Sequence, residues 1–507
     1  MPTAAPAGDR AAVTGPWAIA LLGWIGATKA TGAALATIAL VDASRALALT
    51  PDERTLAASV GTLALAATVI ASGLLADRIG RRRVLMGSFA IAILGSMLLA
   101  VSWGVVPYVL GAVVTGVAYG AMFAGSFAYV KTVAPGSGLG WALGLFGTYA
   151  TIVAALASIS GGYLADVSWR ALFLVVPVMC VISLLATPRL LPVVPRVPGG
   201  RVDITGLVLL GLGLVLLLAG VSRATTAGGW GSWGPAGVGV AVLALWCWWE
   251  ARQPEPAFPI RLFRSGPFAA AALVGVTFNI VQAASSLQFS DYWQFVDGQT
   301  PFVVSLEIQP FYVLGIVGAL VAGRLLSAGR SPRALISISC LITGAGLLAV
   351  VPLSQSASYW AYLPAIAVIG TGMMAGMTAQ SQVFVDQAPH TSYGSVTASR
   401  STVGQIGFAF GFAASTAIIQ RLTDAGTLTR LQESGVSPSR DQRALGAVEG
   451  FVESGRVAAG GVVDTALADA AASFHSALQI LMLLCAVVML VSAGAVWLLM
   501  RDRPRPH

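Results

Sequence analysis

Charge is scarce in this sequence. Only 10% of its 507 residues are Asp, Glu, Lys or Arg, whereas 56% are hydrophobic and the mean hydropathy is +0.81. Soluble domains contain roughly 25% charged residues and about 45–50% apolar ones. A water-soluble globular fold is therefore excluded, and lipid must surround most of the chain.

Cysteine and histidine are also few, which removes several classes of site. The four cysteines lie inside apolar runs, so we expect buried thiols and no disulfide framework: Cys180, Cys247, Cys340 and Cys485. No pair of metal ligands at helical spacing occurs among the three histidines, His390, His475 and His507. No nucleophile elbow or phosphate-binding loop stands out either. The sequence therefore predicts no cofactor, no metal site, no enzymatic activity and no direct use of ATP.

Apolar runs long enough to cross a bilayer recur along the chain. A helix needs about 20 apolar residues to span the hydrocarbon core. By this measure we predict an all-α polytopic membrane protein with about 14 transmembrane helices, near residues 17–41, 57–75, 84–102, 106–130, 138–162, 170–191, 204–222, 233–249, 267–289, 302–326, 333–353, 359–383, 393–420 and 475–500.

The distribution of basic residues tests this arrangement. With a cytoplasmic N-terminus and an even number of crossings, the inside loops and tails hold 18 of the 29 Lys and Arg residues. The short outside loops hold four, and the long segment 421–474 holds five more. Short loops rich in Lys and Arg stay in the cytoplasm. We therefore expect both termini inside a cell membrane, and we interpret the net charge of +8 as an orientation signal, not as a nucleic-acid site.

The spans form two groups of six with two further spans between them. We predict a first bundle over 17–191, two additional helices over 204–249, and a second bundle over 267–500. The connections expected in the cytoplasm are the tail 1–16, a basic proline-rich linker 192–203, the loop 250–266 and the tail 501–507. Segment 421–474, rich in Ala, Gly and both signs of charge, is predicted to be a solvated extracellular loop. A small amphipathic helix over Ala444–Ala471 is the alternative.

A distinctive loop joins the second and third spans. It reads Gly73-Leu-Leu-Ala-Asp77-Arg78-Ile-Gly80-Arg81-Arg-Arg. A glycine at position 73 permits close approach of a neighbouring helix, and one at position 80 permits a tight turn. Asp77 ends a helix at the membrane surface, where an arginine or the positive end of a helix can neutralise it. The arginines suit the anionic inner leaflet, so a purely topogenic basic loop is the alternative.

This loop resembles the signature of the major facilitator superfamily, and the whole chain is similar to that family's fourteen-span drug:proton antiporter branch. The resemblance implies the major facilitator fold, alternating access, and a latch formed by the signature loop: Gly73, Asp77, Arg78, Gly80 and Arg81. A degenerate second copy of the loop, which lacks the aspartate, follows the tenth span and reads Gly323-Arg324-Leu-Leu-Ser-Ala-Gly329-Arg330. Such repeated halves place one binding site near the membrane midplane.

Three positions depart from that branch. Its proton-coupled members carry an acidic residue in the middle of the first span, where this chain has Lys29. The arginine and the Gln-Gly pair of the fourth span are replaced in the stretch 112–116, and the fifth-span antiporter motif keeps only Gly161 and Gly162. Proton antiport is therefore in doubt, although the fold assignment is unaffected.

Ionisable groups inside the membrane are candidates for substrate binding or coupling. Lys29 is expected either to attract an acidic substrate or to replace the proton relay, or else to pair structurally with a carboxylate such as Glu307. Glu307 could instead be an interfacial residue without a partner, and Arg400 could extend to the cytoplasmic surface. Polar side chains that plausibly line a cavity, or only join helices, complete the candidate set: Asn279, Gln282, Asp291, Tyr292, Gln294, Gln309 and Gln380.

The leading hypothesis is a secondary transporter that exports a hydrophobic or amphipathic small molecule such as a drug, an antibiotic, a lipid or a metabolite. Its partners are then the lipid bilayer, that substrate, and protons or another ion, with no nucleic acid. Two alternatives remain open. One is an uptake or uniport carrier for an anionic solute, and the other is a membrane sensor that keeps the fold without transporting.

Overall fold

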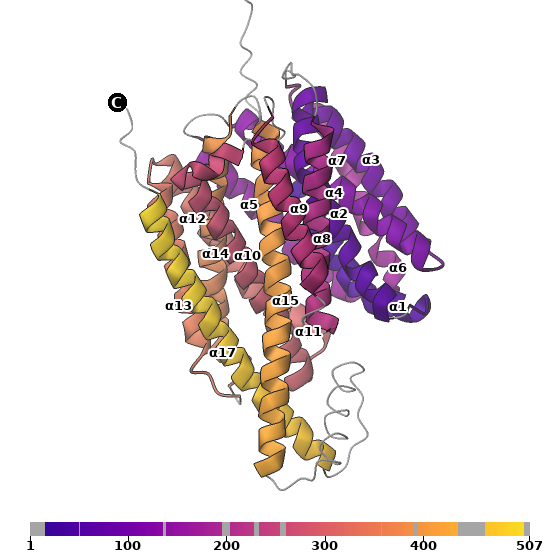
Figure 1. Ribbon diagram of the computed structural model, residues 1–507, viewed down its shortest axis with the longest axis vertical. Coiled ribbons are helices and arrows are strands. Elements are labelled where there is room, and N and C mark those ends of the chain that lie inside the picture. Colours follow the sequence, from indigo (N-terminus) through magenta and orange to yellow (C-terminus); the bar gives the residue numbers. More distant parts are fainter. Residues whose placement is uncertain are drawn as a thin grey trace, which may run out of the picture.

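The computed structural model describes residues 16–49, 51–134, 138–194, 203–227, 233–253, 260–355, 357–389, 393–433 and 462–500. Every regular element within these ranges is helical (Figure 1). Outside these ranges lie residues 1–15 of the predicted tail 1–16, the tail 501–507, most of the linker 192–203, part of the loop 250–266 and residues 434–461. The all-α prediction is confirmed for the part of the chain that the structure describes.

In the described residues up to Leu190, the first half of the molecule comprises seven helices. They are α1 (Pro16–Ala46), α2 (Pro51–Ile79), α3 (Arg81–Ala100), α4 (Val105–Val133), α5 (Leu139–Val167), α6 (Trp169–Leu172) and α7 (Val175–Leu190). Two further helices, α8 (Ile204–Ala227) and α9 (Gly234–Glu250), follow it and pack against each other.

The second half begins with a 3-10 turn, η3 (Ile260–Arg264), followed by α10 (Gly266–Asp291). A π-helical turn, η4 (Tyr292–Val296), extends α10. The second half continues with α11 (Pro301–Glu307), α12 (Gln309–Ser327), α13 (Pro332–Val350), α14 (Tyr359–Gln387), α15 (Tyr393–Glu433) and α17 (Val462–Leu499). In Figure 1, α15 and α17 reach beyond the other helices at the lower end of the bundle.

The two halves repeat one packing pattern. In the first half α2 and α3 pack on α4, α1 packs on α5, and α7 packs on α1 and α3. In the second half α12 and α13 pack on α14, α10 packs on α15, and α17 packs on α10 and α13. The six long helices of the first half thus each have a counterpart with these same main neighbours in the part of the chain that the structure describes. The internal repeat inferred from the two loops therefore extends to whole bundles.

Two seams join the halves. Helix α5 packs along α12, and α2 packs along α15. Since α2 is the counterpart of α12 and α5 that of α15, the two seams are equivalent by the internal repeat. Helix α8 contacts both α2 and α15, which places the α8–α9 pair beside one seam. The α2–α8–α15 contact is apolar and includes Leu63, Leu218 and Ala409.

The number of spans differs from the prediction. Twelve helical segments within the described ranges are long and apolar enough to cross a membrane, so the count of 14 is not confirmed. The two expected spans outside this set correspond to α1 and α9. Helix α9 has only 17 residues, fewer than the roughly 20 that a hydrocarbon core requires. Helix α1 has 31 residues, but several of its side chains lie outside the described part.

Two predicted spans are broken within the membrane-spanning length. The span expected at 302–326 consists of α11 and α12, which separate at Ile308. Pro310 follows and fits the first turn of α12 because it has no N–H to donate. The span expected at 170–191 begins with the single turn α6, and Ser168 caps that turn by accepting from the Arg170 amide.

The predicted extracellular loop 421–474 requires a correction. Helix α15 continues to Glu433 and α17 already begins at Val462, so helix occupies both ends of that segment. Hydropathy alone places a helix end where the apolar run ends. Residues 421–433 are polar, but they include the good helix formers Arg, Leu, Ala and Gln and no proline, so the helix extends beyond its apolar part.

Candidate functional site

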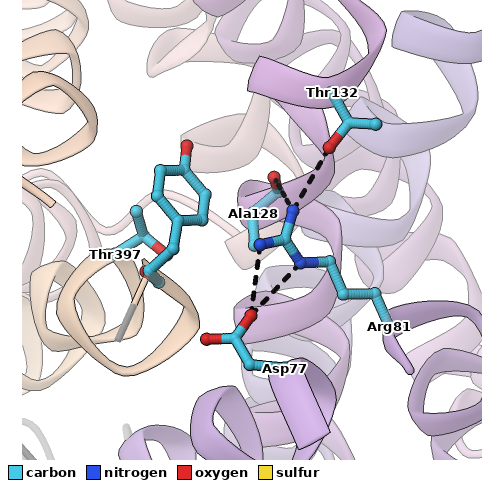
Figure 2. Close-up of polar contacts among 6 residues, drawn as sticks. Asp77, Arg81, Ala128, Thr132 and Thr397 are labelled. Atoms are coloured by element: carbon cyan, nitrogen blue, oxygen red, sulfur yellow. Dashed lines mark hydrogen bonds and ion pairs between the residues drawn. The ribbon is translucent and has the colours of Figure 1, made fainter. Parts of the chain in front are cut away.

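The signature loop forms a compact polar cluster at the junction of α2 and α3 (Figure 2). The Arg81 guanidinium lies 3.1 Å from the Asp77 carboxylate, which is only 4% exposed. The same guanidinium donates to the Ala128 carbonyl at 3.1 Å and to the Thr132 hydroxyl at 3.2 Å. Arg81 therefore connects the α2–α3 loop to the end of α4, and the charges of Asp77 and Arg81 neutralise each other.

An aromatic residue of the second half covers this cluster. Tyr393, the first residue of α15, presents its ring to the Arg81 guanidinium at 4.9 Å and to the Lys131 ammonium at 5.1 Å. Burial raises the pKa of the Tyr393 hydroxyl above its ordinary value, so the phenol stays neutral. Two cations of the first half thus meet one ring of the second half. From here on the name latch covers Asp77 and Arg81 of the signature loop together with Tyr393, which covers Arg81, and Lys131, which faces the same ring.

The ring of Tyr393 is expected to contribute a measurable part of the latch. Cation–π contacts are worth about 0.5–2 kcal/mol each. Replacement Tyr393→Leu should therefore shift the balance toward the state with a separated latch by roughly threefold to thirtyfold. Alkylation of Ser327→Cys, at the same end of the molecule, reports this shift. Tyr393→Phe keeps the ring and should match the wild type. Equal alkylation rates in the Leu and Phe variants would show that the ring plays no part.

The glycines of the two loop copies adopt similar backbones. Gly80 has φ of 106° and Gly329 has φ of 81°, a region that side chains other than glycine rarely adopt. The predicted turn role of Gly80 is therefore met, and its degenerate copy shares the geometry. Gly73 is buried within α2, and Arg78 lies in the last turn of that helix.

The α5–α12 seam is tightly closed at one end. The Trp141 amide donates to the Ser327 hydroxyl at 2.8 Å, and the Arg324 guanidinium lies 5.0 Å from the Trp141 ring. A Cβ added at Gly144 would lie 2.8 Å from the Ala319 carbonyl oxygen. Since the latch also joins the halves at the end of the bundle where the loop copies lie, we call this the latch end. It is closed in this structure.

Lys29 and Arg400, on helices of different halves, face the same aromatic ring. The Lys29 ammonium lies 4.8 Å from the Phe123 ring centroid, and Arg400 lies 6.0 Å from the same ring and 5.2 Å from that of Phe127. An intramembrane charge costs about 2.5–3.5 kcal/mol on insertion scales. Arg400 contacts these rings in this structure, and its extension to the cytoplasmic surface stays a prediction.

The wall beneath these cations is aromatic. Phe123 and Phe127 of α4 stack with ring centroids 5.8 Å apart, and Phe146 of α5 meets Phe127 edge to face at 6.0 Å. Gly26 brings α1 close to this wall, since a Cβ there would lie 2.8 Å from Phe146. Sequence reasoning found the two cations but missed these rings, which are separated from them by long stretches of chain.

The structure does not pair Lys29 with Glu307. Glu307 accepts a hydrogen bond from the Gln299 amide at 3.0 Å, and its backbone carbonyl accepts from the Tyr359 hydroxyl at 2.9 Å. All three residues belong to the second half, at the end of the bundle opposite the latch. The expectation that these two charges neutralise each other is therefore wrong for this conformation.

Most other predicted candidates bond within their own helix or join helices. Asn279 donates to the Gly275 carbonyl, Gln309 to that of Ser305, and Gln294 to the Ser290 hydroxyl. Gln380 is buried and ties α14 to α10 through the Ala271 carbonyl at 2.9 Å. Gln282 and Asp291 are half-buried on α10. A role of these residues in binding substrate stays a prediction.

Tyr292 belongs to a buried hydrogen-bonded group that sequence reasoning missed. The Nε2 atom of His475 lies 2.9 Å from the Leu353 carbonyl, which can only accept, so Nε2 carries a proton. The Nδ1 atom lies 3.1 Å from the Tyr292 hydroxyl. The group therefore ties α17 to η4 and to the α13–α14 connection, which is a structural role.

A separate apolar cavity of about 850 Å³ lies among α1, α5 and α7. It is lined by Trp24 and Thr31 of α1, and by residues such as Tyr163 and Met179. At 100° per residue, Trp24 and Thr31 share one face of α1, and Lys29 points about 140–160° away from them. This cavity therefore does not contain the paired cations.

Comparisons with known proteins agree with this architecture. The Major Facilitator Superfamily model matches residues 21–412. The Multidrug resistance protein B homolog of Mycobacterium tuberculosis is 30% identical over 65% of this chain and 62% of its own length. The Tetracenomycin C resistance and export protein of Streptomyces glaucescens is 28% identical over 69% of this chain and 66% of its own length.

Solved structures show the same fold. A bacterial homolog of the human lysosomal transporter Spinster, in an inward-facing and unoccupied conformation, matches with a TM-score of 0.59 and 14% identity over 97% of this chain and 98% of that one. The sequence matches span between about two fifths and two thirds of the curated relatives' own length. The family match, the repeated bundles and the loop at Asp77 together lead to one conclusion: this multi-pass membrane protein belongs to the major facilitator superfamily of transporters.

Proposed function

We propose that this chain is a secondary active transporter that exports a hydrophobic or amphipathic small molecule by alternating access. The observation that carries the proposal is the latch. Within the first half, Arg81 binds the Asp77 carboxylate and the Ala128 carbonyl. The ring of Tyr393, from the second half, covers the Arg81 guanidinium. A contact that joins the two repeated bundles at the latch end is suited to break and re-form during a transport cycle.

Relatives named for multidrug resistance and antibiotic export support the direction of transport. We further propose that α1 and α9 also cross the membrane, which gives 14 spans when added to the twelve. The basic loop at Arg81 and the asymmetry of the other arginines support a cytoplasmic latch end and cytoplasmic termini. The relatives come from bacteria, which favours the plasma membrane.

Coupling to protons is expected to be weak. In the described part of α1, Lys29 occupies the middle of the helix, where a titrating carboxylate would be needed. Purified protein in liposomes should move a panel of amphipathic compounds with rates that change less than about threefold when a proton gradient of two pH units is imposed. Strong gradient-driven accumulation would contradict this expectation, and persistence of that accumulation in Lys29→Ala would assign coupling to a carboxylate, with Asp291 and Glu307 the first to test.

A second candidate function is a carrier for an anionic solute, in uptake or uniport. The observation that favours it is Lys29, which faces Phe123 and is not paired with Glu307. The liposome panel separates the two candidates, because an exporter of hydrophobic and amphipathic compounds would also move the neutral members of the panel, which an anion carrier rejects.

A further inference from the structure

Two cations from the two halves lie against one aromatic wall of α4. Lys29 comes from α1 and Arg400 from α15, and both lie over the ring of Phe123. Phe127 adds a second ring beneath Arg400 at 5.2 Å. Like charges that converge in a low-dielectric interior repel each other, so this arrangement is unfavourable unless something negative joins it.

No acidic side chain supplies that negative charge in the described part of the chain. The electrostatic neighbour of Lys29 is Arg400, another cation. Glu307 is engaged by Gln299, and Asp77 by Arg81. The Arg400 Nε–H is buried and has no hydrogen-bond partner among the described residues. A buried, unsatisfied guanidinium donor beside a second cation is a site prepared for an anion.

We infer that Lys29 and Arg400 together bind the acidic group of an amphipathic anion, whose apolar body lies against Phe123 and Phe127. The inference rests on the proposed transport function and names the substrate class of the central site. An arginine presents a planar fork that matches a carboxylate, and a lysine adds a mobile point charge. Because the cations lie on different halves, the bound anion offsets their repulsion and holds α1 and α15 together.

Charge-selective modification tests the site without knowledge of the natural substrate. In the full chain with Cys180, Cys247, Cys340 and Cys485 changed to Ser, Lys29→Cys places a thiol beside Arg400. The anionic reagent sulfonatoethyl methanethiosulfonate should react roughly tenfold faster than its trimethylammonium counterpart, after each rate is normalised to free thiol. Adding Arg400→Gln should abolish this preference. Arg189→Gln serves as the control, because Arg189 is exposed and bonds only within its own helix.

Equal rates for the two reagents, no reaction with either, or a preference that survives Arg400→Gln would each overturn the inference. A folded, monodisperse Lys29→Cys protein is required, and Lys29→Arg, which keeps the charge, provides a second variant for binding measurements if the cysteine variant is unstable.

Binding in lipid nanodiscs addresses the ligand class directly, with 2-naphthoate, methyl 2-naphthoate and 2-naphthylmethylammonium as probes. The anion should bind most tightly, and Lys29→Gln and Arg400→Gln should each weaken it by roughly tenfold while changing the neutral ester less than about twofold. Lys29→Arg should retain most of the affinity. Equal loss for all three probes, or tightest binding of the ammonium compound, would contradict an anion site.

The two proposals fail in different ways. If the charge preference and naphthoate binding are present but liposomes show no transport of any compound, the site stands and the transport function fails. If transport occurs but the variants treat anion and ester alike, the transport function stands and the anion site fails.

Discussion

Asp77→Asn should reduce transport by roughly tenfold to a hundredfold while the protein still inserts and folds. The change replaces a buried charged acceptor of Arg81 with a neutral amide, at a site only 4% exposed. Hydrogen bonds to charged groups contribute about 1.5–3 kcal/mol, and 1.4 kcal/mol corresponds to a factor of ten. That energy is lost only in the state with a closed latch, so the protein accumulates in the state with an open latch. Initial rates in liposomes measure the effect.

Asp297→Asn is the matched control for this change. It removes a carboxylate of the same size from an exposed position at the opposite end of the bundle, and it should leave transport within about twofold of the wild type. Unchanged transport by a well-expressed Asp77→Asn protein would show that the signature loop serves only to orient the chain in the membrane.

Gly144→Leu should prevent closure of the latch end. A Cβ at this position would lie 2.8 Å from the Ala319 carbonyl oxygen and 3.2 Å from the Gly323 Cα, both backbone atoms that cannot rotate away. Helices α5 and α12 would have to separate, at a cost of about 1–3 kcal/mol or more. Transport should fall by roughly tenfold or more, and Ser327→Cys should be alkylated faster by a similar factor.

Gly87→Leu is the control for this prediction. Gly87 also lies inside a helix, but no heavy atom of a neighbouring segment approaches within 4 Å of the Cβ that would be added there. This variant should transport and be alkylated like the wild type. If Gly144→Leu behaves in the same way, the closed α5–α12 seam is not part of the cycle.

Hydropathy predicted the all-helical fold because lipid imposes long apolar helices whose ends are readable from sequence, whereas the orientation inferred from the basic residues stays a prediction. The same criterion misplaced the end of α15 at residue 420, since helix formation continues through polar residues once the apolar part is anchored. The break between α11 and α12 had a visible signal in Pro310, which the long apolar run around it concealed.

The candidate site was predictable only in part. Lys29, Arg400 and Asp77 are visible because a charge within or beside an apolar run is conspicuous. Their partners are not, since Tyr393 and Phe123 are ordinary residues in apolar helices and become relevant only through tertiary contact. The Lys29–Glu307 pair was a wrong prediction for the same reason. A sequence indicates how deep in the membrane a charged residue lies, but not toward which neighbouring helix its side chain points.

Alternating access itself is tested most directly by distances measured at both ends of one molecule. Spin labels at Arg83 and Arg330 join the two halves across the latch end, and labels at Trp103 and Ser358 join them across the opposite end; all four positions are exposed. Measurement uses the cysteine-free protein in nanodiscs, as wild type and as Asp77→Asn. The account predicts opposite shifts, with the latch-end distance lengthening and the opposite-end distance shortening in Asp77→Asn. Distances that remain unchanged, or that lengthen at both ends together, would contradict it.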